Sequence, residues 1–297
     1  MKKFNTRVSL FQRTHALLLI VMLALLAGCS SVRFSYNQGD TLLYWWLDTY
    51  VNFESRQVDI AKRDIRELFQ WHRNTQLNDY VALLGTFQRQ LAANPTKADL
   101  MNGYREIRTR SERLAAHAVP AMTTLALSLT PEQIGNIERK FASKNEEYRR
   151  KSLRGSAEQR QRKRFEKSLE QFELWFGKFN REQEAALRRA SDARPLDGDA
   201  WLEERMFRQH RIVATLRKIQ DEKMGREQAT VQIQGLLREL FGRMESPERK
   251  AFYDAYNDSM TTYILSAIRL TTPEQKAHAQ KRIQGWINDL NALAAGR

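Results

Sequence analysis

The sequence predicts an all-α protein, folded as a mostly antiparallel bundle of several helices. The chain has 297 residues but only 13 Gly and 6 Pro, so few of its residues disfavour a helix. Apolar residues recur every three or four positions, and no stretch alternates as a strand would. Five segments also carry related helix-start sequences. This length suffices for one sizeable core or two small ones.

Residues 1–28 have the features of a secretory leader. A positively charged start precedes an apolar run at residues 16–27, which is too short to cross a bilayer as a stable helix. An uncleaved anchor or a buried helix is the alternative interpretation. The positive charges are those of Lys2, Lys3, Arg7 and Arg13.

The leader ends in Leu26-Ala27-Gly28-Cys29, and Cys29 is the only cysteine of the chain. This run resembles the lipobox of bacterial lipoproteins, in which the leader is cut before the cysteine and the thiol is acylated, for example with palmitate. The resemblance implies a signal peptide at 1–28 and a lipidated tether at 29–39, held by more than one acyl chain. Ser30, where Asp would favour the inner membrane, implies anchoring in the outer membrane facing the periplasm. A lone cysteine excludes an internal disulfide.

The chain is basic, with a net charge of +14. Four of these charges are leader cations, so residues 29–297 carry 14 − 4 = +10. An exported lipoprotein seldom meets nucleic acid, so we expect an envelope protein, lipid or glycan as partner instead. Residues 144–167 predict a basic elbow around Gly155, with a solvated helix surface as the alternative. The basic elbow comprises Arg149, Arg150, Lys151, Arg154, Arg160, Arg162, Lys163 and Arg164.

After the tether, Asp40 or Thr41 is expected to cap a helix rich in aromatic residues. These aromatic residues point in several directions around the helix. The helix is therefore either buried on more than one side or lies on a membrane interface, where Trp and Tyr are favoured. They include Trp45, Trp46, Tyr50 and Phe53.

The next predicted helix spans residues 57–92 and has a continuous apolar stripe. His72 and Gln76 fall on that stripe four residues apart, and hence on the same face. Because an unpaired buried polar group costs about 1–3 kcal/mol, we expect both to hydrogen-bond to a neighbouring segment. If the chain has a polar site, we expect it at Asp40, His72, Arg73 and Gln76, and hydrogen-bonded core residues are the alternative.

Helix starts recur along the rest of the chain. Thr96 and Asp99 predict a cap for a helix that Pro120 is expected to kink. In the later starts a polar residue is followed by Glu in the first turn and Gln at the third helical position, which is a capping box. A break at 193–198 is the candidate sub-boundary within a helical domain at 40–297. The starts are Thr130 to Gln133, Ser156 to Gln159, Asn180 to Gln183, Thr272 to Gln275 and, less closely, Ser246 to Arg249.

Two stretches of the chain resemble one another. Met122-Thr123-Thr124 precedes the start at Thr130, and Met260-Thr261-Thr262 precedes the start at Thr272. The separations are 138 residues for the Met-Thr-Thr runs and 142 for the caps, a difference of about one helical turn. The pattern indicates either an ancient duplication into two related helical halves or a chance similarity of caps.

The sequence contains no catalytic or metal-binding motif. It has no H-E-x-x-H, no paired Cys/His spacing, no G-x-S-x-G and no Gly-rich phosphate loop. Glu274 and His278 lie four residues apart, but one such pair is common by chance. We therefore expect no metal, no cofactor other than the lipid on Cys29, and no enzymatic activity.

Four groups of residues carry a family resemblance: Tyr36-Asn37 with Asp40 and Trp45-Trp46-Leu47, then Trp71-His72-Arg73, then Leu127 to Gln133, and Asp199 to Arg205. Together they are similar to an uncharacterised family of Gram-negative envelope lipoproteins, a domain of unknown function. The resemblance implies a helical envelope lipoprotein and carries no established activity. A weaker resemblance, through Leu129, Thr130 and Gln133, is to periplasmic chaperones with an L-T-x-x-Q motif, although a capping box explains the same letters.

Three functions are compatible with the sequence. The first is a non-enzymatic interaction or scaffold protein of the cell envelope, and the second is a chaperone-like binder of envelope proteins. The third is an enzyme acting on cell wall or lipid. A large exposed apolar concavity would favour the second, and a cleft in which His72 meets a carboxylate would favour the third. The oligomeric state stays open at this point.

Overall fold

The computed structural model describes residues 31–296, which are helical and contain no strand. The predicted all-α bundle is therefore confirmed for this range, whereas Cys29 and the predicted leader lie outside the described residues. The elements are α2 (Ser31–Asn37), α3 (Gly39–Val51), α4 (Ser55–Thr75), α5 (Leu77–Ala92), α6 (Lys97–Ser128), α7 (Pro131–Tyr148), η1 (Arg149–Leu153), α8 (Ala157–Phe176), α9 (Arg181–Asp192), α10 (Gly198–Asp221), α11 (Arg226–Gly242), η2 (Arg243–Glu245), α12 (Lys250–Leu270) and α13 (Pro273–Ala294).

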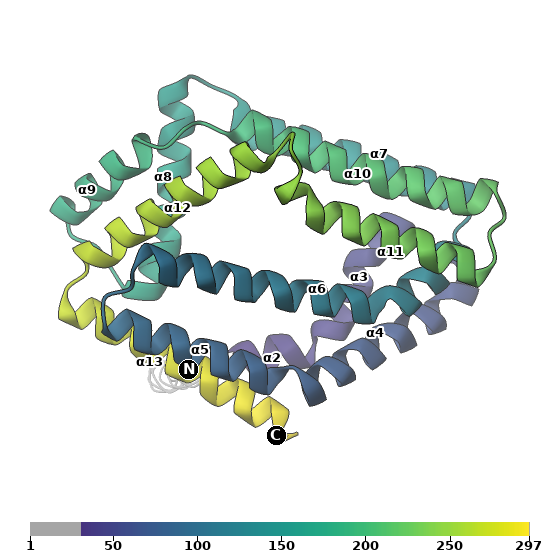
Figure 1. The fold of residues 1–297 in the computed structure, drawn as a ribbon, viewed down its shortest axis with the longest axis horizontal. Helices are drawn as coiled ribbons and strands as arrows, with labels where there is room; N and C mark the ends of the chain where they lie inside the picture. The colour runs from purple at the N-terminus through teal and green to yellow at the C-terminus, as the bar shows by residue number, and fades with distance from the viewer. Residues whose placement is uncertain (1–30, 297) are drawn as a thin grey trace, which may run out of the picture.

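Neighbouring long helices run antiparallel, and α6 crosses the middle of the frame that the other helices form (Figure 1). The guanidinium of Arg226, at the start of α11, bonds to Thr124 near the end of α6. At the other end of the same pair, Arg108 of α6 donates to the carbonyl of Phe241. The pairs α5–α13 and α7–α10 pack in the same antiparallel way.

Two apolar clusters form the core, one toward each end of the molecule. The first is built by α3, α6, α7, α10 and α11, and the second by α5, α8, α9, α12 and α13. The first includes Val119, Leu129, Ile134, Val213, Ile219 and Ile233, and the second includes Phe165, Phe176, Phe179, Leu187, Tyr263 and Ile283.

Most predicted helix starts are confirmed as capping boxes. The side chains of Thr96, Thr130, Ser156, Asn180 and Thr272 each accept a bond from the backbone N–H three residues later, and that residue bonds back. The start predicted at Ser246 is wrong, because α12 begins at Lys250. Arg249 cannot complete a box there, because a guanidinium has only donors and offers no acceptor to the Ser246 N–H. It binds the carboxylates of Glu203 and Glu204 instead.

Two other boundaries differ from expectation. The helix predicted over 57–92 begins at Ser55 and is divided at Gln76 into α4 and α5. Asp40 does not cap α3, which begins one residue earlier because α2 leads almost directly into it and the Leu42 N–H bonds to the Gln38 carbonyl. α6 contains Pro120 and extends to Ser128 as one helix, and the kink expected at Pro120 stays a prediction.

The tether predicted at 29–39 contains a packed helix from residue 31 onward. Arg33 of α2 forms an ion pair with Asp289 of α13 at 3.1 Å, and this carboxylate is buried. Burial raises the pKa of Asp289, and the positive charge of Arg33 partly opposes that rise. Tyr36, in the last turn of α2, bonds to His72 of α4. The start of the described chain is therefore fixed to two helices.

The break at 193–198 connects the two cores, because α9 belongs to one and α10 to the other. Arg164 of α8 holds this connection by donating to the carbonyls of Ser191 and Arg194, at 2.6 and 3.1 Å, and to that of Pro195. Burial lowers the pKa of the Arg164 guanidinium. Both cores also draw on helices from before and after the break.

Candidate functional site

An apolar groove of about 290 Å³ lies between α3, α4 and α6. All but three of the residues that line it are apolar, and the exceptions are Gln57, Asp64 and Ser128. The apolar lining consists of Leu43, Trp46 and Leu47 of α3, Phe53 of the turn between α3 and α4, Ile60, Ala61, Ile65 and Leu68 of α4, and Ala118, Ala121, Met122 and Leu125 of α6.

Large apolar side chains stand exposed in the lining of the groove. Trp46 is 55% exposed, Ile60 38% and Met122 37%, and each comes from a different helix. Single exposed apolar residues are common on protein surfaces, but several around one apolar concavity indicate a contact surface. An apolar group that entered the groove would remove these side chains from water.

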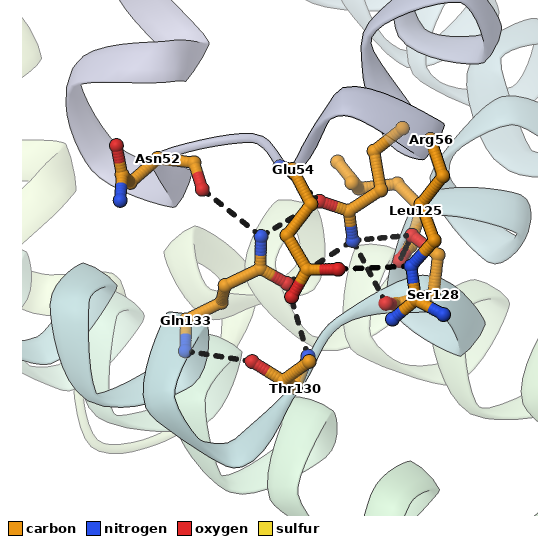
Figure 2. Close-up of polar contacts among 8 residues, drawn as sticks. Asn52, Glu54, Arg56, Leu125, Ser128, Thr130 and Gln133 are labelled. Atoms are coloured by element: carbon orange, nitrogen blue, oxygen red, sulfur yellow. Dashed lines mark hydrogen bonds and ion pairs between the residues drawn. The ribbon is translucent and has the colours of Figure 1, made fainter.

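A pair of glutamines closes the fold beside the groove. Each side-chain amide of Gln57 and Gln133 donates to the other's carbonyl oxygen, at 3.1 and 2.7 Å. Gln57 also donates to the Ser128 carbonyl at the end of α6, and Gln133 donates to the Asn52 carbonyl after α3. Figure 2 shows Gln133 among Thr130, Asn52 and Glu54, on the side of the pair opposite Ser128. Each glutamine thus completes the cap of its own helix. It also donates to a backbone carbonyl just before the helix of the other glutamine.

The same arrangement recurs at the opposite end of the molecule. Gln183 and Gln275 exchange side-chain bonds of 2.9 and 3.3 Å. Gln183 donates to the Leu270 carbonyl and Gln275 to the Lys178 carbonyl, each at 2.7 Å. Each glutamine pair therefore joins two turns between helices that are distant in the sequence. A similar glutamine pair thus accompanies each of the two starts at Thr130 and Thr272, and duplication or chance similarity of the caps both stay open.

The polar groups of the groove are already engaged by the protein. The carboxylate of Asp64 binds Arg63 at 2.7 Å, and the Ser128 hydroxyl donates to the Leu125 carbonyl. Gln57 makes the bonds described above. The groove therefore presents shape and apolar surface to a ligand, and its polar residues hold the walls in place.

His72 and Gln76 each bond to a neighbouring segment, as expected. The Tyr36 hydroxyl lies 2.8 Å from Nδ1 of His72, and Arg113 of α6 donates to the Gln76 side chain at 3.3 Å. Burial lowers the pKa of His72 and raises the pKa of Tyr36 to about 12. The hydrogen-bond partner of Nδ1 of His72 is thus a hydroxyl, and not the carboxylate that would favour the enzyme interpretation.

Arg73 joins this polar site through α2, whereas the hydrogen bonds of the Asp40 side chain within the described residues are to Thr41. The Arg73 guanidinium donates to Asn37 at 2.6 Å and lies 5.3 Å from the centre of the Tyr36 ring. Asp40 bonds to the backbone N–H and hydroxyl of Thr41 in the first turn of α3. The residues brought together are thus His72, Arg73 and Gln76, and their contacts fasten α2 and α6 to the junction of α4 and α5.

Ion pairs and hydrogen bonds occupy more than half of the basic elbow. Glu146, Glu147, Asp199 and Glu166 pair with Arg149, Lys151, Arg160 and Arg162 respectively. Arg164 donates to the three carbonyls of the 193–198 break. Arg150, Arg154 and Lys163 have no ion pair within residues 31–296, and all three are exposed. The surface left for an anionic partner is therefore small.

The groove was not predicted from the sequence. Ile60 and Met122 lie at the edges of the apolar stripes of their helices. A single exposed apolar residue at such a position is common on protein surfaces and does not by itself indicate a site. The sequence did contain one indication of the glutamine pair, because Gln57 follows Glu54 by three residues, which is the spacing of a capping box. In the structure its side chain accepts a bond from the Glu54 N–H, as the other capping glutamines do at their own helix starts. The partnership of Gln57 with Gln133 needs the tertiary structure.

The described residues contain neither the arrangement of a metal site nor a helix that could cross a membrane. Between residues 31 and 296 no group of three His, Cys, Asp or Glu side chains has the arrangement of a metal site. Over the same range, every helix is too short or too polar to span a membrane.

A family of unknown function, DUF6279, matches residues 49–238, which is more than half of the chain. The chain belongs to the DUF6279 family. No curated protein and no solved structure matches it. The DUF6279 region contains α4, α6, both glutamines of the first pair and the groove lining from Phe53 onward. It ends before α12 and α13 and therefore excludes Gln275.

Proposed function

We propose that this protein is a lipid-anchored interaction protein of the Gram-negative cell envelope, which holds a partner protein in the apolar groove. Acylated Cys29 would fasten it to the outer membrane, with the helical domain in the periplasm. The groove carries this proposal, because it joins exposed apolar side chains from three helices with polar groups that are already bonded. Such a site favours binding over a chemical reaction.

The size of the groove favours one defined segment over an unfolded client. Ligand pockets usually measure about 300–1,000 Å³, and this one is at the lower bound. It has room for one or two side chains of an amphipathic helix, which is a common mode of peptide recognition. A chaperone that cradles long unfolded segments would need a larger apolar surface. The scaffold interpretation is therefore preferred to the chaperone-like one.

The groove can be tested by photo-crosslinking in intact cells. A photoreactive amino acid would replace Met122 in the groove and, as a matched control, Val231, which is also exposed and apolar but does not line the groove. We expect one stoichiometric envelope protein to crosslink at residue 122 and none at residue 231. The crosslink should disappear when Ile60→Asp places a charge across the groove.

Two outcomes would contradict the groove proposal. Equal crosslinking at residues 122 and 231 would show that the groove has no special affinity. Many substoichiometric products at residue 122 alone would support the chaperone-like alternative. Circular dichroism of Ile60→Asp would verify that the variant is folded, which is expected because Ile60 is already partly exposed.

The anchor is tested separately through Cys29. Cys29→Ser should prevent acylation and leave a precursor or a soluble form, because the only thiol of the chain is removed. The measurement is the mass of the N-terminal peptide together with fractionation of membranes. Acyl-free peptide from the unaltered protein, or unchanged membrane retention of Cys29→Ser, would refute the anchor.

A further inference from the structure

The exposed face of α3 carries no charged residue. Its exposed positions follow helical spacing and form one stripe: Thr41, Leu42, Trp45, Trp46 and Thr49. A solvent-facing helix stripe normally bears charges, and the neighbouring α4 does so with Arg56, Asp59, Lys62, Arg63, Arg66 and Glu67, all exposed. The α3 stripe has the opposite character, with two tryptophans and a leucine on its outer side.

The apolar exposure extends onto α2. Phe34 is 69% exposed, Leu42 51% and Trp45 60%. The exposed residues of α2, which are Phe34, Ser35 and Asn37, also carry no charge. The only charged side chain of α2 is that of Arg33, which is turned to its ion pair with Asp289. We call Phe34, Leu42, Trp45 and Trp46 the aromatic face.

The aromatic face lies close to the proposed anchor. Cys29 precedes Ser31, the first residue of α2, by two positions, and two residues span at most about 7 Å. The contacts of Arg33 and Tyr36 fix α2 against α13 and α4, so the anchor is not separated from the domain by a long linker. A lipid on Cys29 would hold the domain within reach of the bilayer surface.

We propose that the aromatic face lies in the interface of the bilayer that holds the lipid anchor. Trp combines a large apolar ring with an N–H that stays in contact with water, and it is enriched at this level of a membrane. Amphipathic helices bind in the same way, parallel to the membrane plane with the apolar side about 5–10 Å deep. The surface fixes the orientation of the domain and turns the groove, whose wall includes Trp46, toward the membrane. This inference rests on the proposed acylation of Cys29.

Environment-sensitive labels can locate the aromatic face. The acylated protein would be purified and reconstituted into vesicles of phosphatidylethanolamine and phosphatidylglycerol. Because acylation blocks the only native thiol, Thr41→Cys provides one site for a nitrobenzoxadiazole label. Thr109→Cys, at an exposed position of α6, is the matched control. We expect vesicles to raise the emission at residue 41 several-fold and to leave it unchanged at residue 109, and brominated lipids should quench residue 41 alone.

A charge on the aromatic face should undo this effect. Trp45→Asp should weaken docking about tenfold, because a large interfacial ring is replaced by a carboxylate. Ile60→Asp is the control, since Ile60 lines the groove but is not part of the stripe, and it should leave the emission at residue 41 unchanged. Trp45 is mostly exposed, so Trp45→Asp should fold normally, as circular dichroism would verify.

The outcomes separate this inference from the proposed function. An acylated N-terminal peptide without an emission change at residue 41 overturns the aromatic face and leaves the anchor and the groove intact. Equal changes at residues 41 and 109 also overturn it. An acyl-free peptide overturns the proposed anchor and, with it, the orientation inferred here. Loss of the crosslink at residue 122 in Ile60→Asp, with normal emission at residue 41, supports both the groove and the aromatic face.

Discussion

At the scale of single residues, the fold depends on a few buried polar groups. Glu204 of α10 is fully buried and lies 2.6 Å from the guanidinium of Arg249. It also lies 3.4 Å from Arg243 and accepts a bond of 3.0 Å from the Tyr253 hydroxyl. Burial and this bond to Glu204 raise the pKa of Tyr253 to about 12. One carboxylate thus joins α10 to the start of α12.

Replacing Glu204 should therefore be far more damaging than replacing its neighbour Glu203. Breaking a buried ion pair costs about 3–5 kcal/mol, and we expect Glu204→Gln to lower the free energy of unfolding by about 3 kcal/mol, since the arginines are partly hydrated. Glu203→Gln breaks an exposed pair with the same Arg249 and should cost about 0–1 kcal/mol. Denaturant unfolding of both variants measures the difference. Equal losses would show that Glu204 has no special role.

His72 should make the stability of the fold depend on pH. Burial lowers its pKa, so the unfolded chain takes up this proton at a higher pH than the folded chain does. The contribution is complete above about pH 6.5, the unfolded pKa, and is lost as the pH falls below it. His72→Asn, which keeps an acceptor for Tyr36 but cannot titrate, should reduce the loss of unfolding free energy between about pH 7.5 and pH 5.5. An unchanged loss would exclude His72 as its source.

At the scale of elements, a capping glutamine has two different roles in this chain. Gln133 is buried, and it bonds both to its own cap and to Asn52 and Gln57 around the turn between α3 and α4. Gln159 completes an equivalent box at the start of α8, but it is exposed and bonds to Ser156 alone within the described residues. The two helix starts have the same kind of capping sequence. Burial decides how much each glutamine contributes to the stability of the fold.

This difference predicts unequal costs for the same substitution. Gln133→Leu removes the partner of the Asn52 carbonyl and two of the bonds of the buried Gln57, which keeps those to Ser128 and Glu54. At about 1–3 kcal/mol for each buried group affected, we expect a loss of about 2–4 kcal/mol. Gln159→Leu removes an exposed cap and should cost about 1 kcal/mol or less. Thermal and denaturant unfolding would compare the two. A Gln133 variant no less stable than the Gln159 variant would contradict the structural role of the glutamine pair.

The same contrast explains which elements the sequence could predict. Helix starts such as Thr130 and Thr272 depend on hydrogen bonds between residues that are close in sequence. A few adjacent residues therefore sufficed to predict them. The prediction at Ser246 was wrong because Arg249, at the third position, has no acceptor for the Ser246 N–H, and its guanidinium binds Glu204, which is distant in sequence. His72 was expected to have a partner, since burial demands one, but only the fold shows that the partner is Tyr36. The groove is formed by the edges of three helices, so the apolar stripe of any one helix does not predict it.

At the scale of the whole molecule, the two cores are interleaved along the chain. The first core contains α7 and α10, the second contains α8 and α9, and the chain returns to the second core after α11. α6 belongs to the first core and also packs against α12 of the second. Neither core can be completed by one continuous half of the sequence, which distinguishes this arrangement from two domains joined by a linker.

Interleaving predicts that both ends unfold together. We expect one transition by far-ultraviolet circular dichroism and by tryptophan fluorescence, and Gln133→Leu and Gln275→Leu should each shift it, although they act at opposite ends. Because the two glutamine pairs share no partner, the loss in the double variant should equal the sum of the single losses within about 0.5 kcal/mol. If Gln275→Leu moved one transition and Gln133→Leu another, the two cores would be separate folding units. One shared transition would instead mean that a partner bound in the groove also stabilises the distant core, since it binds only the folded chain.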